Sequence, residues 1–393
     1  MMETLCEDGT YSLDFPSVVC GVVLNVLFAL VTLILTYPRL YTFLCTTSPL
    51  KKVTSDSSIS SGLPSILKDL RIIFPISARR QVQTFKARDK SSTIQGAICV
   101  KCFPEHTLSR YMNEVSCLKR IQDHAGPSIH FCPRYIASLT VERDTAFGQQ
   151  LNMRLPCRAI LMEFIPWKLC DYLSKGVSTT SALHITESIF SALSYLHDIV
   201  GLAHHDIKPD NIGMVNHESV KIFDFDLSVM DGSEGTNDCG TISFLSPELV
   251  TADSLRKFSC SELQCADIFA AGLCVWVILT SCDRSLLRGE LGESGHMKMP
   301  YLDKLDLKGC SFLERQDKRR IVRETLHQLM DTGYQNESEL WWADHQDAST
   351  MVKVWNWCTS PKPAERPSAK TLVDFLAPLV HNHVHVSTYC IDG

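Results

Sequence analysis

Residues 204–211 read HHDIKPDN, and residues 224–226, thirteen positions further on, read DFD. Within the first stretch, Asp206 can accept or orient the hydroxyl of an acceptor molecule, and Lys208 can place an ammonium beside a moving phosphoryl group. Transfer of a γ-phosphoryl group needs little covalent chemistry from the protein, so the residues required are those that position the nucleophile and neutralise negative charge. The two stretches therefore predict phosphoryl transfer to an alcohol.

Two further side chains of this region are suited to a hard cation such as Mg²⁺. Asn211 offers a neutral oxygen, and Asp224 offers an anionic one. Residues 220–223 alternate like a short strand after the polar turn at 216–219, which predicts a hairpin that brings Asn211 and Asp224 together. A single polar residue in a loop often only caps a helix or faces solvent, but an ordered set of four favours a site.

The order and spacing of these residues resemble the eukaryotic protein kinase family, and other landmarks of that family follow. Residues 96–101, GAICVK, look like the strand whose lysine holds the α- and β-phosphates of ATP, which would be Lys101. Residues 110–118, RYMNEVSCL, form a helical pattern, and Glu114 within it matches the glutamate that pairs with that lysine.

The resemblance also supplies the region that would contact adenine. Residues 160–165, ILMEFI, are similar to the strand and hinge that hold adenine through backbone groups. Met162 would be the gatekeeper, and Glu163 and Ile165 would belong to the hinge side of the nucleotide site.

Later landmarks lie in the second half of the chain. Residues 240–248 resemble the end of the activation segment, and Glu248 is expected to pair with Arg366. Asp267 and Gly272 match the start of the buried helix that ties down the catalytic loop in this family.

The resemblance covers roughly residues 66–380 and implies an α+β, two-lobed protein-kinase-like fold. A small strand-rich lobe with one helix would precede a larger helical lobe. ATP and Mg²⁺ are the implied cofactors, with Asn211 and Asp224 as metal ligands. Lys208 is typical of serine/threonine kinases, so the expected acceptors are Ser or Thr hydroxyls of protein substrates.

The phosphate-covering loop departs from the family pattern. When Val82 is aligned with the valine after the glycine-rich motif, Pro75, Ser77 and Arg80 stand where three glycines are expected. Glycine lets backbone amides approach phosphates closely, and proline has no amide hydrogen. Either the arginines at 79 and 80 replace backbone contacts with charge, or nucleotide binds weakly; retained but weakened binding is favoured.

Two further departures concern regulation. His205 stands where regulated kinases carry an arginine that receives an activation-segment phosphate, so phosphorylation of Thr236 or Thr241 is not expected to be the principal switch. A solvent-facing loop histidine is the alternative. Asp226 replaces a glycine, and because aspartate tolerates left-handed backbone geometry, a turn role is favoured over a place near the metal.

Two other functions fit parts of the sequence. A pseudokinase scaffold would keep the fold while its altered phosphate loop binds nucleotide poorly. A small-molecule kinase would share the Asp-then-Asn catalytic loop, but Lys208, the SPE sequence at 246–248 and Arg366 resemble the protein-substrate platform instead.

The N-terminus predicts a membrane anchor. Residues 18–36 are apolar apart from an asparagine and two threonines, and roughly 20 helical residues span a bilayer core of about 30 Å. Four acidic residues and no Lys or Arg precede this run, whereas three basic residues follow it by position 52, which places the kinase-like region in the cytosol. A cleaved signal peptide is the competing interpretation, but the basic segment that begins such peptides is missing here. A buried core helix is less favoured still.

The predicted organisation of the 393 residues is therefore a tail outside the cytosol, a transmembrane helix, a juxtamembrane linker, the kinase-like domain and a C-terminal tail, at 1–17, 18–36, 37–65, 66–380 and 381–393. Residues 283–347 form either a docking insert or surface elaboration. A net charge of −6 without a long basic run argues against nucleic acid as a partner. The seventeen scattered cysteines predict reduced core thiols, and the sequence does not define an oligomeric state.

Overall fold

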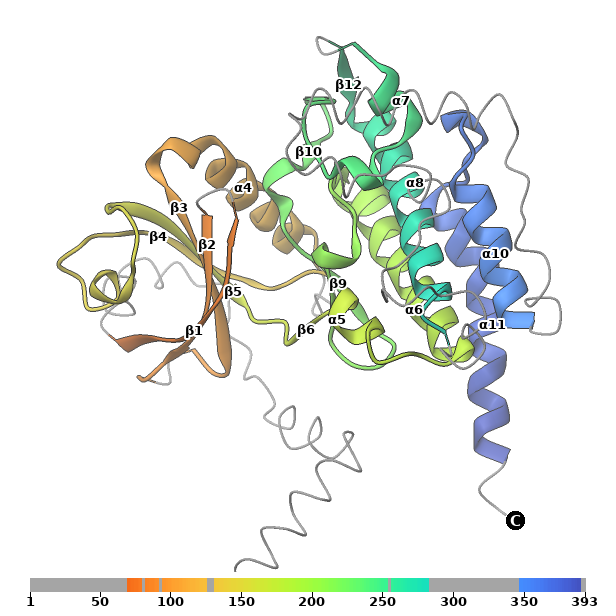
Figure 1. The fold of residues 1–393 in the computed structure, drawn as a ribbon, viewed down its shortest axis with the longest axis horizontal. Coiled ribbons are helices and arrows are strands. Elements are labelled where there is room, and N and C mark those ends of the chain that lie inside the picture. Colours follow the sequence, from red (N-terminus) through yellow and green to blue (C-terminus); the bar gives the residue numbers. More distant parts are fainter. Residues whose placement is uncertain are drawn as a thin grey trace, which may run out of the picture. The chain divides into compact units, whose positions relative to one another are not determined.

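A computed structural model describes residues 69–79, 82–91, 94–125, 131–253, 256–282 and 346–389, all in one unit of the chain. The predicted membrane helix at 18–36, its flanking segments, Arg80 and residues 283–345 lie outside the described residues. Two layers of structure follow in chain order: a sheet with one helix, and then a set of helices (Figure 1).

The first layer is a five-stranded antiparallel sheet of order β1-β2-β3-β5-β4 (Figure 1). Its strands are Leu70–Arg79 (β1), Val82–Asp89 (β2), Ala97–Pro104 (β3), Tyr135–Val141 (β4) and Cys157–Glu163 (β5). In β3, Val100 and Cys102 point into an apolar core, whereas the intervening Lys101 faces a cavity. This alternation follows from the period of two in a strand, and it confirms the predicted strand at 96–101.

Helix α4 runs from Leu108 to His124 and carries one buried stripe. Its buried residues are Glu114, Cys117, Leu118 and Ile121, which recur at the three- and four-residue intervals of an amphipathic helix. The predicted helix around Glu114 is thereby confirmed, with a carboxylate placed on its apolar face.

The second layer is helical and is built around α8, Cys260–Leu279. The other long helices are Thr179–Ser194 (α6), Gln346–Cys358 (α10) and Ala369–Tyr389 (α11). Ser259 and Glu262 form a capping box at the start of α8. A Cβ at Gly272 would lie 2.5 Å from the Cβ of Cys358, so the close approach of α8 and α10 requires glycine there.

Helix α8 is apolar on all sides because it is surrounded by other elements. Among the described residues it is the one helix long and apolar enough to cross a membrane, and 83% of its most apolar window is buried inside the protein. Such burial is typical of the core helix of a globular domain. It gives only weak evidence for a membrane span.

Short strands and helices complete the fold, and some of them carry the site. The strands are Trp167–Lys168 (β6), Leu202–Ala203 (β7), Ile212–Met214 (β8), Val220–Ile222 (β9), Val229–Met230 (β10), Glu234–Thr236 (β11) and Lys257–Ser259 (β12). The short helices are Glu105–Thr107 (η1), Gly148–Gln150 (η2), Leu169–Leu173 (α5), Tyr195–Val200 (η3), Pro209–Asn211 (η4), Phe225–Leu227 (η5), Ile242–Phe244 (η6), Pro247–Thr251 (α7) and Pro363–Glu365 (η8). Antiparallel pairing of β8 with β9 confirms the predicted hairpin.

Two further predictions can be compared with the packing. Arg366 makes two hydrogen bonds to Glu248, of 2.7 and 2.8 Å, as predicted. No disulfide is formed by the cysteines in the described part of the chain, which agrees with reduced core cysteines. Cys99 and Cys102 lie three positions apart on β3 and therefore on opposite faces, so their spacing does not form a metal site.

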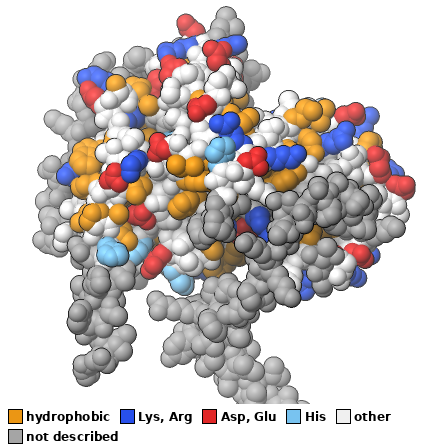
Figure 2. All heavy atoms as spheres, turned by 180° about the vertical axis from the view of Figure 1, so that it is seen from behind, with side chains coloured by type: hydrophobic (Ala, Val, Ile, Leu, Met, Phe, Trp, Pro, Cys, Tyr) orange, Lys and Arg blue, Asp and Glu red, His pale blue; other side chains and the backbone are white. Residues whose placement is uncertain are grey.

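The surface of the described residues mixes both signs of charge. On the face shown in Figure 2, Lys and Arg side chains are interspersed with Asp and Glu. Several hydrophobic side chains also reach this surface, as is normal for a folded protein.

Candidate active site

A buried ion-pair network centres on Lys101 of β3. Its ammonium lies 2.6 Å from Oε2 of Glu114 on α4, and it also contacts Oδ1 of Asp224. Burial alone would lower the pKa of Lys101, but the two carboxylates outweigh it and raise that pKa above its usual value. Burial raises the pKa of Glu114 to about 7, although Lys101 opposes this shift. For Asp224, Lys101 overcomes the effect of burial and lowers the pKa to about 2.

A second network surrounds Asp206 of the catalytic loop. Lys208 donates to Oδ2 of Asp206, and Thr241 donates from Oγ1 to Oδ1 over 2.7 Å. Lys208 also donates to Thr241 over 2.6 Å, so the three side chains form a closed ring. Asn211 donates from Nδ2 to the backbone oxygen of Asp206 over 2.9 Å and to its Oδ2 over 3.0 Å.

This amide orientation bears on the predicted metal site. Because Nδ2 of Asn211 faces Asp206, its Oδ1 points the other way and can act as a cation ligand. The backbone N–H of Phe223 donates to the backbone carbonyl oxygen of Asn211 over 3.0 Å, so the residue before Asp224 is bonded to the loop that carries Asn211. The pair of donors therefore fits Mg²⁺, which prefers one or two carboxylate or amide oxygens together with substrate phosphates.

A buried aspartate of α8 forms hydrogen bonds with the backbone of the catalytic loop. Asp267 accepts hydrogen bonds from the backbone N–H groups of His204 and His205, over 2.6 and 2.8 Å, and contacts His197 at 3.1 Å. Burial would raise the pKa of Asp267, but these hydrogen bonds and the nearby histidines lower it overall. The predicted role of Asp267 in tying down the loop is confirmed.

The ring of His204 links the loop to the segment that carries Asp224. Its Nδ1 accepts from the N–H of Asp206 over 3.2 Å, so its Nε2 carries the proton and donates to the oxygen of Phe223 over 3.0 Å. The same ring packs edge-on against Phe225, with centroids 5.2 Å apart.

His205 differs from the solvent-facing alternative. It is buried, it adopts a left-handed backbone conformation with φ of 66°, and burial lowers its pKa. Its Nε2 has no hydrogen-bond partner among the described residues. A neutral, buried ring beside the activation segment cannot serve as a charged phosphate receptor, which supports the prediction about regulation.

The predicted turn role of Asp226 is wrong. The residue with left-handed geometry in this segment is Asp224, with φ of 75°, whereas Asp226 belongs to the short helix η5. The carboxylate of Asp226 is buried and forms an ion pair with Arg110 of α4. Left-handed geometry at Asp224 lets the chain turn so that both carboxylates face α4 and β3.

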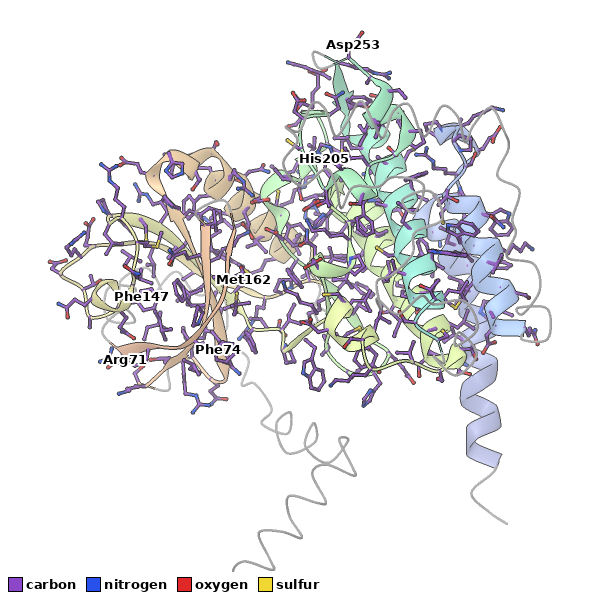
Figure 3. All side chains as sticks on the ribbon, viewed as in Figure 1. Arg71, Phe74, Phe147, Met162, His205 and Asp253 are labelled. Carbon is purple, nitrogen blue, oxygen red and sulfur yellow. The ribbon has the colours of Figure 1, made fainter. Side chains whose placement is uncertain are left out.

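A cavity of about 340 Å³ lies between the sheet and the catalytic loop. All seven residues predicted to bind nucleotide or metal line it, namely Lys101, Glu114, Met162, Glu163, Ile165, Asn211 and Asp224. Its volume is in the range of sites for small cofactors. Pro75 and Ser77 of β1, which stand where the family has glycines, line it as well, and so does Phe74; Figure 3 labels Phe74 and Met162 on the sheet.

Two lysines that the sequence did not predict as site residues contact side chains that line this cavity. Lys221 of β9 places its ammonium 2.6 and 2.8 Å from the two carboxylate oxygens of Glu163, which fixes the start of the hinge. Lys86 of β2 lies over the ring of Phe164, 4.4 Å from its centre. All three residues of β9 are buried, Lys221 among them, so the alternation of the strand gave no signal for this contact.

Comparison with known proteins agrees with this geometry. A family model described as the protein kinase domain matches residues 105–375. The chain belongs to the protein kinase family. The sheet with α4 and the helical layer are accordingly the two lobes of a kinase fold.

Several kinases and one receptor are similar to the chain over part of its length. The cell surface receptor daf-1 of Caenorhabditis elegans is 26% identical over 253 residues, which cover 59% of this chain and 34% of the receptor. The interferon-induced, double-stranded RNA-activated protein kinase of Mus musculus is 35% identical over 135 residues, covering 32% of this chain and 24% of that kinase. A putative mitogen-activated protein kinase 14C of Drosophila melanogaster is 32% identical over 150 residues, covering 36% and 40%. The chain thus spans less than half the length of each of these relatives.

Proposed function

We propose that this chain is a membrane-anchored protein kinase that transfers the γ-phosphoryl group of ATP to Ser or Thr hydroxyls of protein substrates. The observation that carries the proposal is the presence of two ordered networks that Asn211 connects, since Asn211 lines the cavity of the first network and donates hydrogen bonds to Asp206 of the second. Lys101 with Glu114 and Asp224 forms the first, and Asp206 with Lys208 and Thr241 forms the second.

The residues of the chain would act as follows. Asp206, held by Thr241 and Asn211, would orient the acceptor hydroxyl and accept its proton. Lys208 would stabilise the charge that spreads over the transferred phosphoryl group. Lys101, held by Glu114, would position the α- and β-phosphates of ATP.

Asn211 and Asp224 would hold Mg²⁺, and Met162, Glu163 and Ile165 would line the adenine end of the cavity. When bound, Mg²⁺ supplies positive charge to the phosphates. The lowered pKa of Asp224 keeps that ligand anionic at neutral pH.

A phosphorylation assay on the full 393-residue chain tests the enzyme proposal. With ATP, Mg²⁺ and a peptide library, phosphate should appear on Ser or Thr peptides, and it should disappear in Asp206→Asn and Asp224→Asn variants. Transfer to tyrosine only, or to metabolites but to no peptide, would contradict the proposed substrate class.

A pseudokinase scaffold is the second candidate, and one observation favours it. Pro75 and Ser77 line the cavity where backbone amides of glycines would cradle phosphates, and Pro75 has no amide hydrogen to offer. Weak ATP binding without any phosphoryl transfer, to peptides or to the chain itself, would favour this candidate, and robust ATP binding without transfer would equally exclude the enzyme.

A further inference from the structure

Asp226 adds a side chain where the kinase family has glycine, and that side chain has a defined partner. Its carboxylate, which is 4% exposed, forms an ion pair with Nη2 of Arg110. It also lies 4.0 Å from the ammonium of Lys101. Arg110 stands in the first turn of α4, so the ion pair joins that helix to the segment that carries the metal ligand Asp224.

A second side chain of α4 makes contacts parallel to this pair. Asn113 donates from Nδ2 to the backbone oxygens of Ser228, over 2.9 Å, and of Asp226, over 3.1 Å. Arg110, Asn113 and Glu114 are spaced at three and four residues, so they share one face of the helix. One face of α4 thus holds β3 through Glu114 and residues 224–228 through the other two.

The charges explain why Arg110 and Asp226 must occur together. Around Lys101 lie three carboxylates, those of Glu114, Asp224 and Asp226, with ligand atoms within 4.8 Å of one another. Arg110 supplies the second cation of this cluster. Without Arg110, Asp226 would be a buried carboxylate whose nearest cation is the Lys101 ammonium, 4.0 Å away. It would then compete with Glu114 and Asp224 for the one ammonium.

We propose that Arg110 and Asp226 are positioning residues whose ion pair locks α4 onto residues 224–228 in the arrangement that phosphoryl transfer requires. This inference rests on the proposed kinase function. The lock consists of side chains already present in the chain, so it requires no phosphate on the activation segment. Arg110 also balances the charge of Asp226, which leaves the closer contacts of the Lys101 ammonium to Glu114 and Asp224.

The proposed role of Arg110 predicts how kcat should differ among variants of Arg110 and Asp226. Arg110→Ala should lower kcat by about tenfold or more, because it leaves Asp226 free to draw Lys101 away. Asp226→Gly removes the competing carboxylate together with the lock, so kcat should fall only about two- to fivefold. The double variant should resemble Asp226→Gly, and thereby regain most of the activity lost in Arg110→Ala. Arg110→Lys should retain part of the activity.

The experiment measures kcat, KM for ATP and amide hydrogen exchange on the full chain, with Lys119→Ala, an exposed change on the same helix, as the control. Exchange without nucleotide should accelerate at residues 224–228 and in the first turns of α4 in both single variants, but not in the control. Wild-type exchange in Arg110→Ala, or a double variant whose loss equals the product of the two single losses, would overturn the inference.

Exchange also separates this inference from the proposed function. If the wild-type chain transfers no phosphate, the kinase proposal fails, and the exchange pattern alone still decides whether the lock exists. If Arg110→Ala does not fold, Arg110→Lys and Asp226→Asn are compared instead; unchanged exchange in both overturns the lock.

Discussion

At the scale of single residues, Thr241 illustrates how a catalytic loop is held. Its hydroxyl donates to Asp206 and accepts from Lys208, so one oxygen fixes both the proposed hydroxyl-orienting group and the charge-stabilising group. A hydroxyl that bridges an acid and a base in this way acts through geometry, because misplacement by about 1 Å can cost about a hundredfold in rate.

Replacing Thr241 with valine should therefore lower kcat by about ten- to a hundredfold, while KM for ATP changes little, since Thr241 does not line the nucleotide cavity. Thr241→Ser keeps the hydroxyl and is the matched control, with activity close to wild type. Steady-state kinetics on a peptide substrate measure kcat and KM for both variants. Equal losses in the serine and valine variants would show that the methyl group, and not the hydroxyl, matters.

Asp267 makes a prediction about stability and pH. Its two carboxylate oxygens each accept from one backbone N–H group, and asparagine has an NH2 group in place of one of these oxygens, so Asp267→Asn should cost about 1–3 kcal/mol of unfolding free energy. The folded-state pKa lies below the ordinary 3.8, so the contribution is present above that pH and is lost as pH falls through the lowered value.

Urea denaturation at a series of pH values measures this effect. The difference between wild type and Asp267→Asn should be constant near neutral pH and should shrink only below about pH 4. Asp374→Asn, at an exposed carboxylate of α11, is the control and should leave stability within about 0.5 kcal/mol of wild type. A difference that shrinks near pH 7 would point to a histidine as the titrating group.

At the scale of elements, the sequence predicted those features that depend on local periodicity. The strand ending near Lys101, the stripe of α4 and the hairpin between β8 and β9 are each set by residues close in sequence. The ion pair of Arg110 with Asp226 joins residues 116 positions apart, and Lys221 reaches Glu163 across 58. Such pairings depend on how elements pack, and no periodic pattern specifies them.

The strand β1 carries the clearest test of nucleotide binding. It pairs with β2 from Leu70 to Arg79 with two irregularities, one of them between Pro75 and Ser77. Restoring glycine at both positions, Pro75→Gly with Ser77→Gly, should expose backbone amides to the phosphates. The affinity for Mg²⁺-ATP should rise by about three- to tenfold, roughly the net value of one added ordinary hydrogen bond.

Calorimetric titration of the full chain with ATP, with and without Mg²⁺, measures this change. Adenosine, which lacks phosphates, is the matched ligand control, and its affinity should stay constant. An equal gain for adenosine and ATP would mean that the glycines merely open the cavity. A loss for both would mean that Phe74 and its neighbours in β1 need the original backbone to cover the nucleotide.

At the scale of the whole molecule, the remaining question is where the kinase domain lies. The apolar run at 18–36 precedes the domain. Helix α8 is also apolar, but it is buried in the core of the domain. Two lysines in the middle of the run, at Val23 and Leu27, should cost about 2.5–3.5 kcal/mol each on insertion and so release the chain from membranes. In sealed microsomes the wild-type kinase domain should be digested by added protease, because positive charge after residue 36 keeps that side cytosolic. The same two lysines should leave the phosphotransferase activity of the released chain unchanged, since they lie outside the kinase domain. Protection of the kinase domain from protease would reverse the proposed orientation, and a doubly lysine-substituted chain that still pellets with membranes would place the anchor elsewhere.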